Sequence, residues 1–167
     1  MSAETATVVA AWVGAATGVG ALAWNIIAWK LAQRAAQPVI TLELAQQPQV
    51  SGLDHNFCFP TTFSVDVTHA EGRAASVRDV WCVIRGPNKE ELTRFGADEM
   101  RMEVRGRDFT PPHRLEVGDT IRIDMTLPLE FSFVGERGGQ ALAIAVNVQY
   151  ADSRTAQIEV PFTIPPQ

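Results

Sequence analysis

The chain divides into two stretches that differ in how apolar and polar residues follow one another. Residues 6–29 contain no charged side chain. From Pro38 onward, apolar and polar residues alternate with a period of two, which is typical of strands with one buried face. The pattern therefore predicts one long apolar α-helix followed by an all-β domain.

The apolar stretch has the length of a transmembrane helix. As an α-helix, residues 6–29 would extend over about 36 Å, whereas the hydrocarbon core of a bilayer measures about 30 Å. The stretch is longer than the apolar core of a signal peptide, and no basic residue precedes it, so we expect an uncleaved anchor. Lys30 and Arg34 follow it directly. The positive-inside rule then predicts a single-pass membrane protein with its N-terminus outside and its β domain in the cytoplasm.

Pro38 marks the expected end of the helical part. Residues 30–36 are good helix formers, and a proline disfavours helical geometry at the residue before it. We therefore expect an N-terminal tail at residues 1–5, the transmembrane helix at 6–29, a helical extension and linker at 30–37, and the β domain at 38–167.

Small residues recur along the predicted helix. Ala10, Gly14 and Gly18 are four residues apart and share one face, and Ala16 and Gly20 repeat this spacing beside it. Such small-x-x-x-small faces let another helix backbone approach closely. We expect them to pack against transmembrane helices of other subunits or of a second copy.

Aromatic and basic residues lie near both ends of the predicted helix. Tryptophan is frequent at membrane interfaces, where its ring contacts both apolar and polar groups. The residues predicted to mark these interfaces are Trp12, Trp24, Trp29, Lys30 and Arg34.

The β domain contains a series of alternating segments. Val77–Arg85 is apolar on both faces, which predicts a central strand. Pro60 interrupts another segment, which favours an edge position or a bulge there. Strands are expected at residues 39–44, 57–67, 77–85, 92–95, 100–104, 121–127, 141–150 and 158–164.

The last third of the chain resembles a known fold. A Gly118–Asp119 turn precedes an alternating strand, and residues 141–164 have the pattern of a long hairpin. This order is similar to the late strands of immunoglobulin-like bacterial β-sandwich domains. The resemblance implies an antiparallel sandwich. The disulfide arrangement of antibody domains does not map, because Trp81 is adjacent to Cys82.

The net charge of the β domain argues against two classes of partner. Residues 38–167 hold 12 basic and 18 acidic side chains. An acidic domain is a poor electrostatic match to nucleic acid and to anionic lipid, so neither is expected as the main partner of the domain.

Few residues of the chain suggest a catalytic or metal-binding site. His55, His69 and His113 are expected in or beside exposed loops, without the spacing of a metal site. Residues 135–139 are glycine-rich but are expected to join two strands, so they would not form a phosphate-binding loop at a helix N-terminus. Cys58 and Cys82 could be two free thiols or one bridge between sheets. We therefore expect no enzyme activity, no cofactor and no metal.

These features together favour a noncatalytic, membrane-anchored accessory or scaffold subunit of a larger membrane protein complex. Its helix would pack within the complex, and its sandwich would bind partners. The alternative is an extracytoplasmic domain that binds a ligand or an envelope component. A third hypothesis, an enzyme of unrecognised type, would require a deep pocket lined by converging polar groups.

Overall fold

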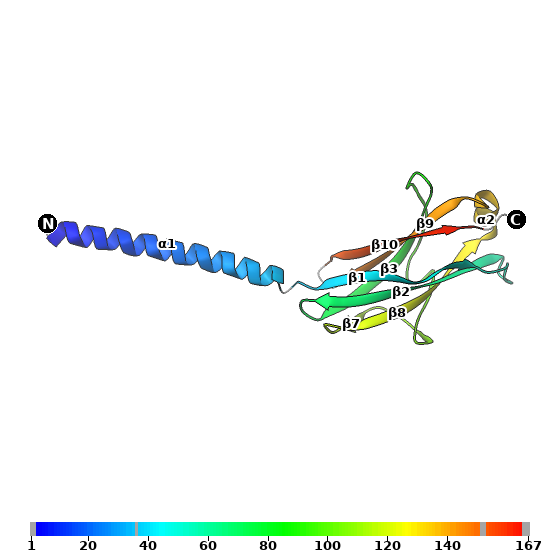
Figure 1. The fold of residues 1–167 in the computed structure, drawn as a ribbon, viewed down its shortest axis with the longest axis horizontal. Coiled ribbons are helices and arrows are strands. Elements are labelled where there is room, and N and C mark those ends of the chain that lie inside the picture. Colours follow the sequence, from blue (N-terminus) through cyan, green and yellow to red (C-terminus); the bar gives the residue numbers. More distant parts are fainter. Residues whose placement is uncertain (1–2, 36, 151–152, 165–167) are drawn as a thin grey trace. The chain divides into compact units, whose positions relative to one another are not determined.

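A computed structural model describes residues 3–35, 37–150 and 153–164, and the side chains of residues 3–7, 9–11, 13 and 35 lie outside the description. The chain separates into two compact units, Met1–Gln37 and Pro38–Gln167, and each is described by itself (Figure 1).

The first unit contains the helix α1, Ala3–Ala35. Alanines favour the helix along its length, and Arg34 interacts favourably with the negative end of the helix dipole in the last turn. The backbone N–H of Gln37 donates to the carbonyl of Arg34 at 3.1 Å, and Pro38 follows. The helix therefore includes both the predicted apolar stretch and most of the predicted extension.

The prediction of a transmembrane helix is wrong. In the part of the chain that the structure describes, no helix is both long and apolar enough to cross a membrane. The stretch lacks charge, but Gly14, Gly18 and Gly20 contribute no apolar side chain, and Asn25 is polar. The predicted single-pass location is wrong for the same reason. The positive-inside rule, which predicted an outside N-terminus and a cytoplasmic β domain, does not apply without a transmembrane helix.

The second unit is an antiparallel β-sandwich with a short helix. One sheet has the order β1-β2-β8-β5-β6, and the other has the order β10-β9-β3-β4, with β7 also paired to β3 (Figure 1). The edge strands β1 and β10 of the two sheets lie next to each other. The strands and the helix are β1 Val39–Val50, β2 Cys58–Glu71, β3 Ala75–Arg85, β4 Glu91–Phe95, β5 Arg101–Val104, β6 Arg107–Asp108, β7 His113–Leu115, β8 Thr120–Glu130, α2 Phe131–Arg137, β9 Ala141–Tyr150 and β10 Thr155–Thr163.

The alternation of apolar residues produces the core between the sheets. Phe63, Val65 and Val67 on β2 are buried, and Phe63 and Val65 are opposite Met125 and Ile123 of β8. Because successive side chains of a strand point to opposite faces, this spacing places all three in one layer. The sulfur of Cys82 on β3 lies 3.9 Å from that of Met125, so the core joins side chains of both sheets.

The predicted antiparallel sandwich is confirmed, and two local predictions need correction. Pro60 is not on an edge strand, since β2 pairs with β1 on one side and with β8 on the other. It lies just past the pair Val50 and Thr61, where the pairing with β1 ends. The glycine-rich segment is not only a loop, because Gly135 belongs to α2, which follows β8 directly.

Candidate functional site

A groove with a volume of about 510 Å³ opens at one end of the sandwich, between β4, the end of β8 and α2. β8 pairs with β2 along its whole length, but its pairing with β5 is limited to residues 124–126. Among the described residues, no strand covers the outer edge of residues 127–130 or the outer edge of β4. The residues that line the groove are Cys58, Leu92, Thr93, Arg94, Phe95, Glu99, Pro128, Leu129, Glu130, Ser132, Phe133 and Glu136.

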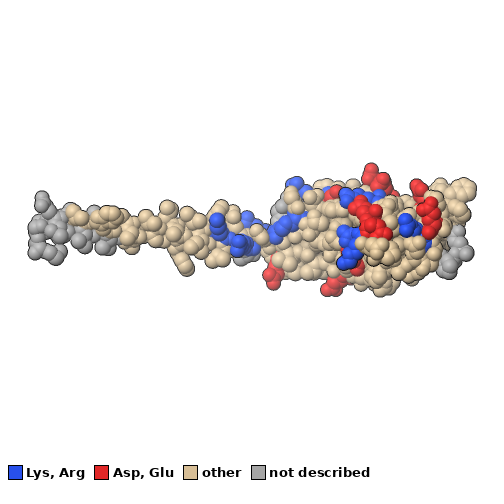
Figure 2. Space-filling model, turned by 90° about the horizontal axis from the view of Figure 1, so that it is seen from above, with Lys and Arg blue, Asp and Glu red and all other residues tan. Residues whose placement is uncertain are grey.

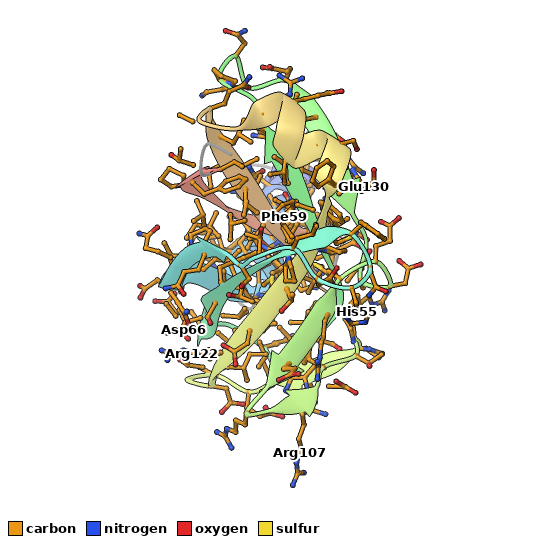
Figure 3. All side chains as sticks on the ribbon, turned by 90° about the vertical axis from the view of Figure 1, so that its right-hand side faces the viewer. His55, Phe59, Asp66, Arg107, Arg122 and Glu130 are labelled. Carbon is orange, nitrogen blue, oxygen red and sulfur yellow. The ribbon has the colours of Figure 1, made fainter. Side chains whose placement is uncertain are left out.

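The floor of the groove is apolar. Leu92, Phe95 and Phe133 are partly buried and pack against the core, and Leu129 is 1% exposed. The rings of Phe59 and Phe131 stack beside it with their centres 6.2 Å apart. Figure 3 shows Phe59 and Glu130 next to α2. The helix is therefore held against the end of the sandwich, where it forms one wall of the groove.

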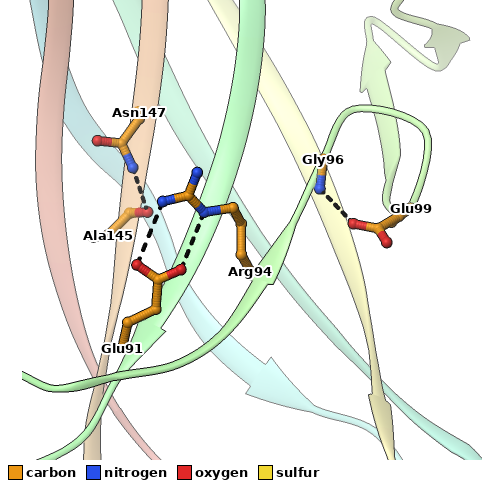
Figure 4. Close-up of polar contacts among 6 residues, drawn as sticks. All are labelled: Glu91, Arg94, Gly96, Glu99, Ala145 and Asn147. Carbon is orange, nitrogen blue, oxygen red and sulfur yellow. Dashed lines mark hydrogen bonds and ion pairs between the residues drawn. The ribbon is translucent and has the colours of Figure 1, made fainter.

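The rim of the groove carries more negative than positive charge. Its arginine, Arg94, is already paired with Glu91, with 3.1 Å between Nε and Oε1 (Figure 4). Glu99 accepts a hydrogen bond from the backbone N–H of Gly96 at 2.8 Å, and Glu130 accepts one from the hydroxyl of Ser132 at 3.4 Å. Within the described residues, neither of these two glutamates nor Glu136 forms an ion pair, so their negative charge is not compensated.

Asp66, elsewhere on the sandwich, differs from the groove glutamates because its carboxylate is paired with a cation. Asp66 on β2 accepts two hydrogen bonds from the guanidinium of Arg122 on β8, at 2.9 Å and 3.0 Å. Hydrogen bonding to Arg122 lowers the pKa of Asp66 below its usual value. The sandwich thus neutralises an acidic side chain across neighbouring strands of the sheet but leaves the groove glutamates without a cation.

The two cysteines are free thiols in different surroundings. Cys58 is half-buried at the groove and lies near the backbone carbonyl of Asn56, with 3.7 Å between sulfur and oxygen. Cys82 is buried in the core, and this burial raises the pKa of its thiol to about 12. Because the thiolate is the reactive form, Cys82 is protected both by its ionisation state and by its position.

We predict that iodoacetamide modifies one cysteine in the native protein and two in the urea-unfolded protein. Mass spectrometry at pH 8 should locate the native modification on Cys58, since only this thiol reaches solvent. A Cys58→Ser variant should then remain unmodified until it unfolds. Modification of Cys82 in the folded protein at a rate close to that of Cys58 would contradict the burial seen in the structure.

The residues predicted for helix packing lie on α1 without steric obstruction. Gly14, Ala16, Gly18 and Gly20 are exposed, and a methyl group added to any of these three glycines would meet no atom within 4 Å. The side chain of Ala10 lies outside the described residues. This face of α1 therefore has space for another helix, and the helix contact stays a prediction.

The residues predicted as interface markers are also exposed. Trp12, Trp24 and Trp29 are between 60% and 74% exposed, and Lys30 and Arg34 lie near the C-terminal end of α1. On the face seen in Figure 2, the described part of α1 shows basic colour only near that end.

The three histidines do not form a common site. His55 is exposed in the turn between β1 and β2, and His113 begins β7. His69, predicted near an exposed loop, is instead fully buried on β2, and neither ring nitrogen has a hydrogen-bond partner among the described residues. In the same part of the chain, no three side chains of His, Cys, Asp or Glu gather as metal ligands.

The groove was not identified from the sequence. Glu99 is far along the chain from Glu130 and Glu136, and the three follow no motif, so only the fold brings Glu99 to the other two. One sequence signal was available, since the alternating pattern continues to Leu129 and could have placed Glu130 at the end of β8.

Comparison with known proteins gives similarity of fold only. No protein-family model and no curated protein matches the sequence. The sporulation control protein Spo0M from Bacillus subtilis is 10% identical, with a TM-score of 0.50, and the match covers 78% of this chain and 50% of Spo0M.

Two further structures have lower TM-scores. A family 123 glycoside hydrolase from Clostridium perfringens is 4% identical over 78% of this chain and 27% of its own, with a TM-score of 0.49. A protein from Bordetella pertussis assigned as ApaA is 12% identical over 79% of this chain and 97% of its own, with a TM-score of 0.42. At such low identity, the likeness to Spo0M supports a shared sandwich fold and assigns no function.

Proposed function

We propose that this chain is a noncatalytic accessory or scaffold protein, which joins another protein through α1 and binds a further partner through its β-sandwich. One observation carries the proposal: α1 exposes large apolar side chains to solvent. They are Val8, Trp12, Val19, Leu22, Trp24, Ile26, Ile27, Trp29 and Leu31, with exposed fractions between 48% and 74%. A helix with so much apolar surface is normally covered by other protein, because its exposure to water is unfavourable.

The spacing along α1 indicates how another helix would approach. At 3.6 residues per turn, Trp12 and Ile27 lie on one side of the helix, and Gly14 and Gly18 lie on the other. A partner helix could come close over the two glycines, where no side chain stands between the backbones. Leu22 and Trp29 flank the glycine face, within about 60° of it around the helix axis, and would complete the contact at its border.

The test is the size of the complex that contains the full chain in cell extract. The native chain, with a mass of 18.2 kDa, should elute in a larger complex. A Gly14→Leu, Gly18→Leu double variant should shift toward the mass of the single chain, because leucine keeps the helix backbones apart. Ala23→Leu is the matched control, since Ala23 lies on the opposite side of α1 from Gly14 and its enlargement should leave the complex intact.

Two outcomes would contradict the proposal. The first is elution of the native chain as a monomer at every concentration. The second is elution of the double variant and the Ala23→Leu control in the same complex. Circular dichroism of each variant should confirm that α1 and the sandwich are still folded, so that a lost complex reflects the altered helix face.

A further inference from the structure

The groove at the end of the sandwich combines an apolar floor with a free sheet edge. Leu92 and Phe95 belong to β4, whose one pairing partner in the described sheet is β3. The N–H and C=O groups on its other side therefore have no ladder partner there. An unpaired edge of this kind can accept an added strand from another chain.

Other edges of the sandwich are less suited to accept a strand. β1 contains Pro48 and has three irregularities in its pairing with β2, and β10 contains Pro161. β6 spans only Arg107–Asp108. Proline and irregular pairing hinder strand addition, because they remove or misplace the backbone donors that an added strand needs. β4 contains no proline.

The end of β8 forms the opposite wall and is also unsuited to pairing. Pro60 is opposite Pro128, and the carbonyl of Pro60 accepts a hydrogen bond from Ser51, on the side away from β8. In an antiparallel pair, the backbone groups of Pro128 must then also point away from β2, toward the groove. Since proline has no N–H, this edge offers no donor at that position. An added segment would therefore pair with β4 and not with β8.

Charge defines the chemistry of the added segment. The groove presents Glu99, Glu130 and Glu136, while the charge of Arg94 is already compensated by Glu91. The domain as a whole is acidic, with 18 acidic and 12 basic side chains. A basic segment would thus be attracted to the domain and would find free carboxylates at the groove.

We propose that this groove binds an extended peptide segment of a partner protein, in which apolar residues alternate with arginine or lysine. The backbone of the segment pairs with the outer edge of β4. Its apolar side chains rest on Leu92, Phe95 and Phe133, and its basic side chains reach Glu99, Glu130 and Glu136. The inference rests on the proposed function, since it names the chemistry of the partner that the sandwich would bind.

The probe is a fluorescein-labelled peptide of seven residues in which valine and arginine alternate. Fluorescence anisotropy should show binding to the full chain. Two further peptides define the specificity. A peptide that alternates valine with glutamate should not bind, because the groove glutamates repel it. A peptide that alternates serine with arginine should bind more weakly, because it lacks the apolar side chains that contact the floor. Hydrogen exchange should show that amides of β4 become protected when the first peptide binds, as expected for an added strand.

The matched protein variants have equal net charge. Glu99→Gln, Glu130→Gln and Glu136→Gln together should weaken binding of the valine–arginine peptide by about tenfold, since three surface ion pairs are lost. Glu43→Gln, Glu71→Gln and Glu116→Gln together remove the same charge from exposed sites outside the groove and should change binding by about twofold at most, through long-range attraction alone.

Three results would overturn the inference: no binding of the valine–arginine peptide at millimolar concentration, equal weakening in the two triple variants, or binding without protection of β4. The α1 complex provides a separate readout. If the complex forms but the peptide does not bind, the groove inference fails and the role of α1 stands. If the peptide binds but no α1 complex exists, the groove inference stands and the proposed role of α1 fails.

Discussion

Replacing Phe63 by alanine is expected to lower the free energy of unfolding of the sandwich by about 3–5 kcal/mol. Phe63 lies on β2 and is 1% exposed, opposite Met125 of β8. The substitution removes most of an aromatic side chain from between the sheets, and neighbouring strands held by backbone pairing can close the cavity only in part. Urea unfolding followed by tryptophan fluorescence measures the change.

Phe57 provides a matched control for this substitution. Its side chain is 72% exposed in the turn before β2, so Phe57→Ala removes the same atoms without opening a cavity. We expect the free energy of unfolding to change by less than about 0.5 kcal/mol. Similar losses in the two variants would contradict the core described for the sandwich.

Replacing Gly118 by valine is expected to lower the free energy of unfolding by about 1–3 kcal/mol. Gly118 has a φ of +89° in the turn before β8, and the N–H of Asp119 donates to the carbonyl of Glu116 at 3.0 Å across this turn. A β-branched residue is strained at such a φ because its Cβ clashes with the backbone. An added Cβ would meet no other atom within 4 Å, so the cost comes from backbone conformation alone.

The control for Gly118 is the same substitution at Gly52. An added Cβ at Gly52 also meets no atom within 4 Å, and Gly52 is not among the residues with a positive φ. Urea unfolding of Gly52→Val should therefore differ little from that of the native chain. If both variants lose the same stability, the turn at Gly118 does not require the left-handed conformation.

The correction at α1 shows which property of the sequence was misleading. The transmembrane prediction rests on the length of residues 6–29 and on their lack of charge, and the helix itself does form. Absence of charge and strong apolarity are different quantities, however, because glycine lowers the second without affecting the first. The same glycines that weaken the membrane prediction provide the open face on which the proposed helix contact depends.

Two of the corrections in the sandwich, at His69 and Pro60, have a common cause. His69 is predicted in or beside a loop, beyond the alternating segment at residues 57–67, yet its side chain is fully buried on β2. Pro60 is predicted at an edge position or a bulge because it interrupts the pattern, yet β2 lies inside the sheet and pairs with β8 without a register shift at Pro60. In both cases, the neighbouring strand decides the environment, and it comes from a distant part of the sequence.

The sequence by itself determined the long helix, the places of most strands and the inward face of each, because these depend on periodicity between near neighbours. It also determined the acidic charge of the domain. Only the tertiary structure decided which strands are edges, where β8 loses its outer partner and which glutamates share a groove. These features depend on pairing between residues far apart in the chain, for which local pattern carries no information. The groove, which has no motif, is therefore a property of the folded sandwich.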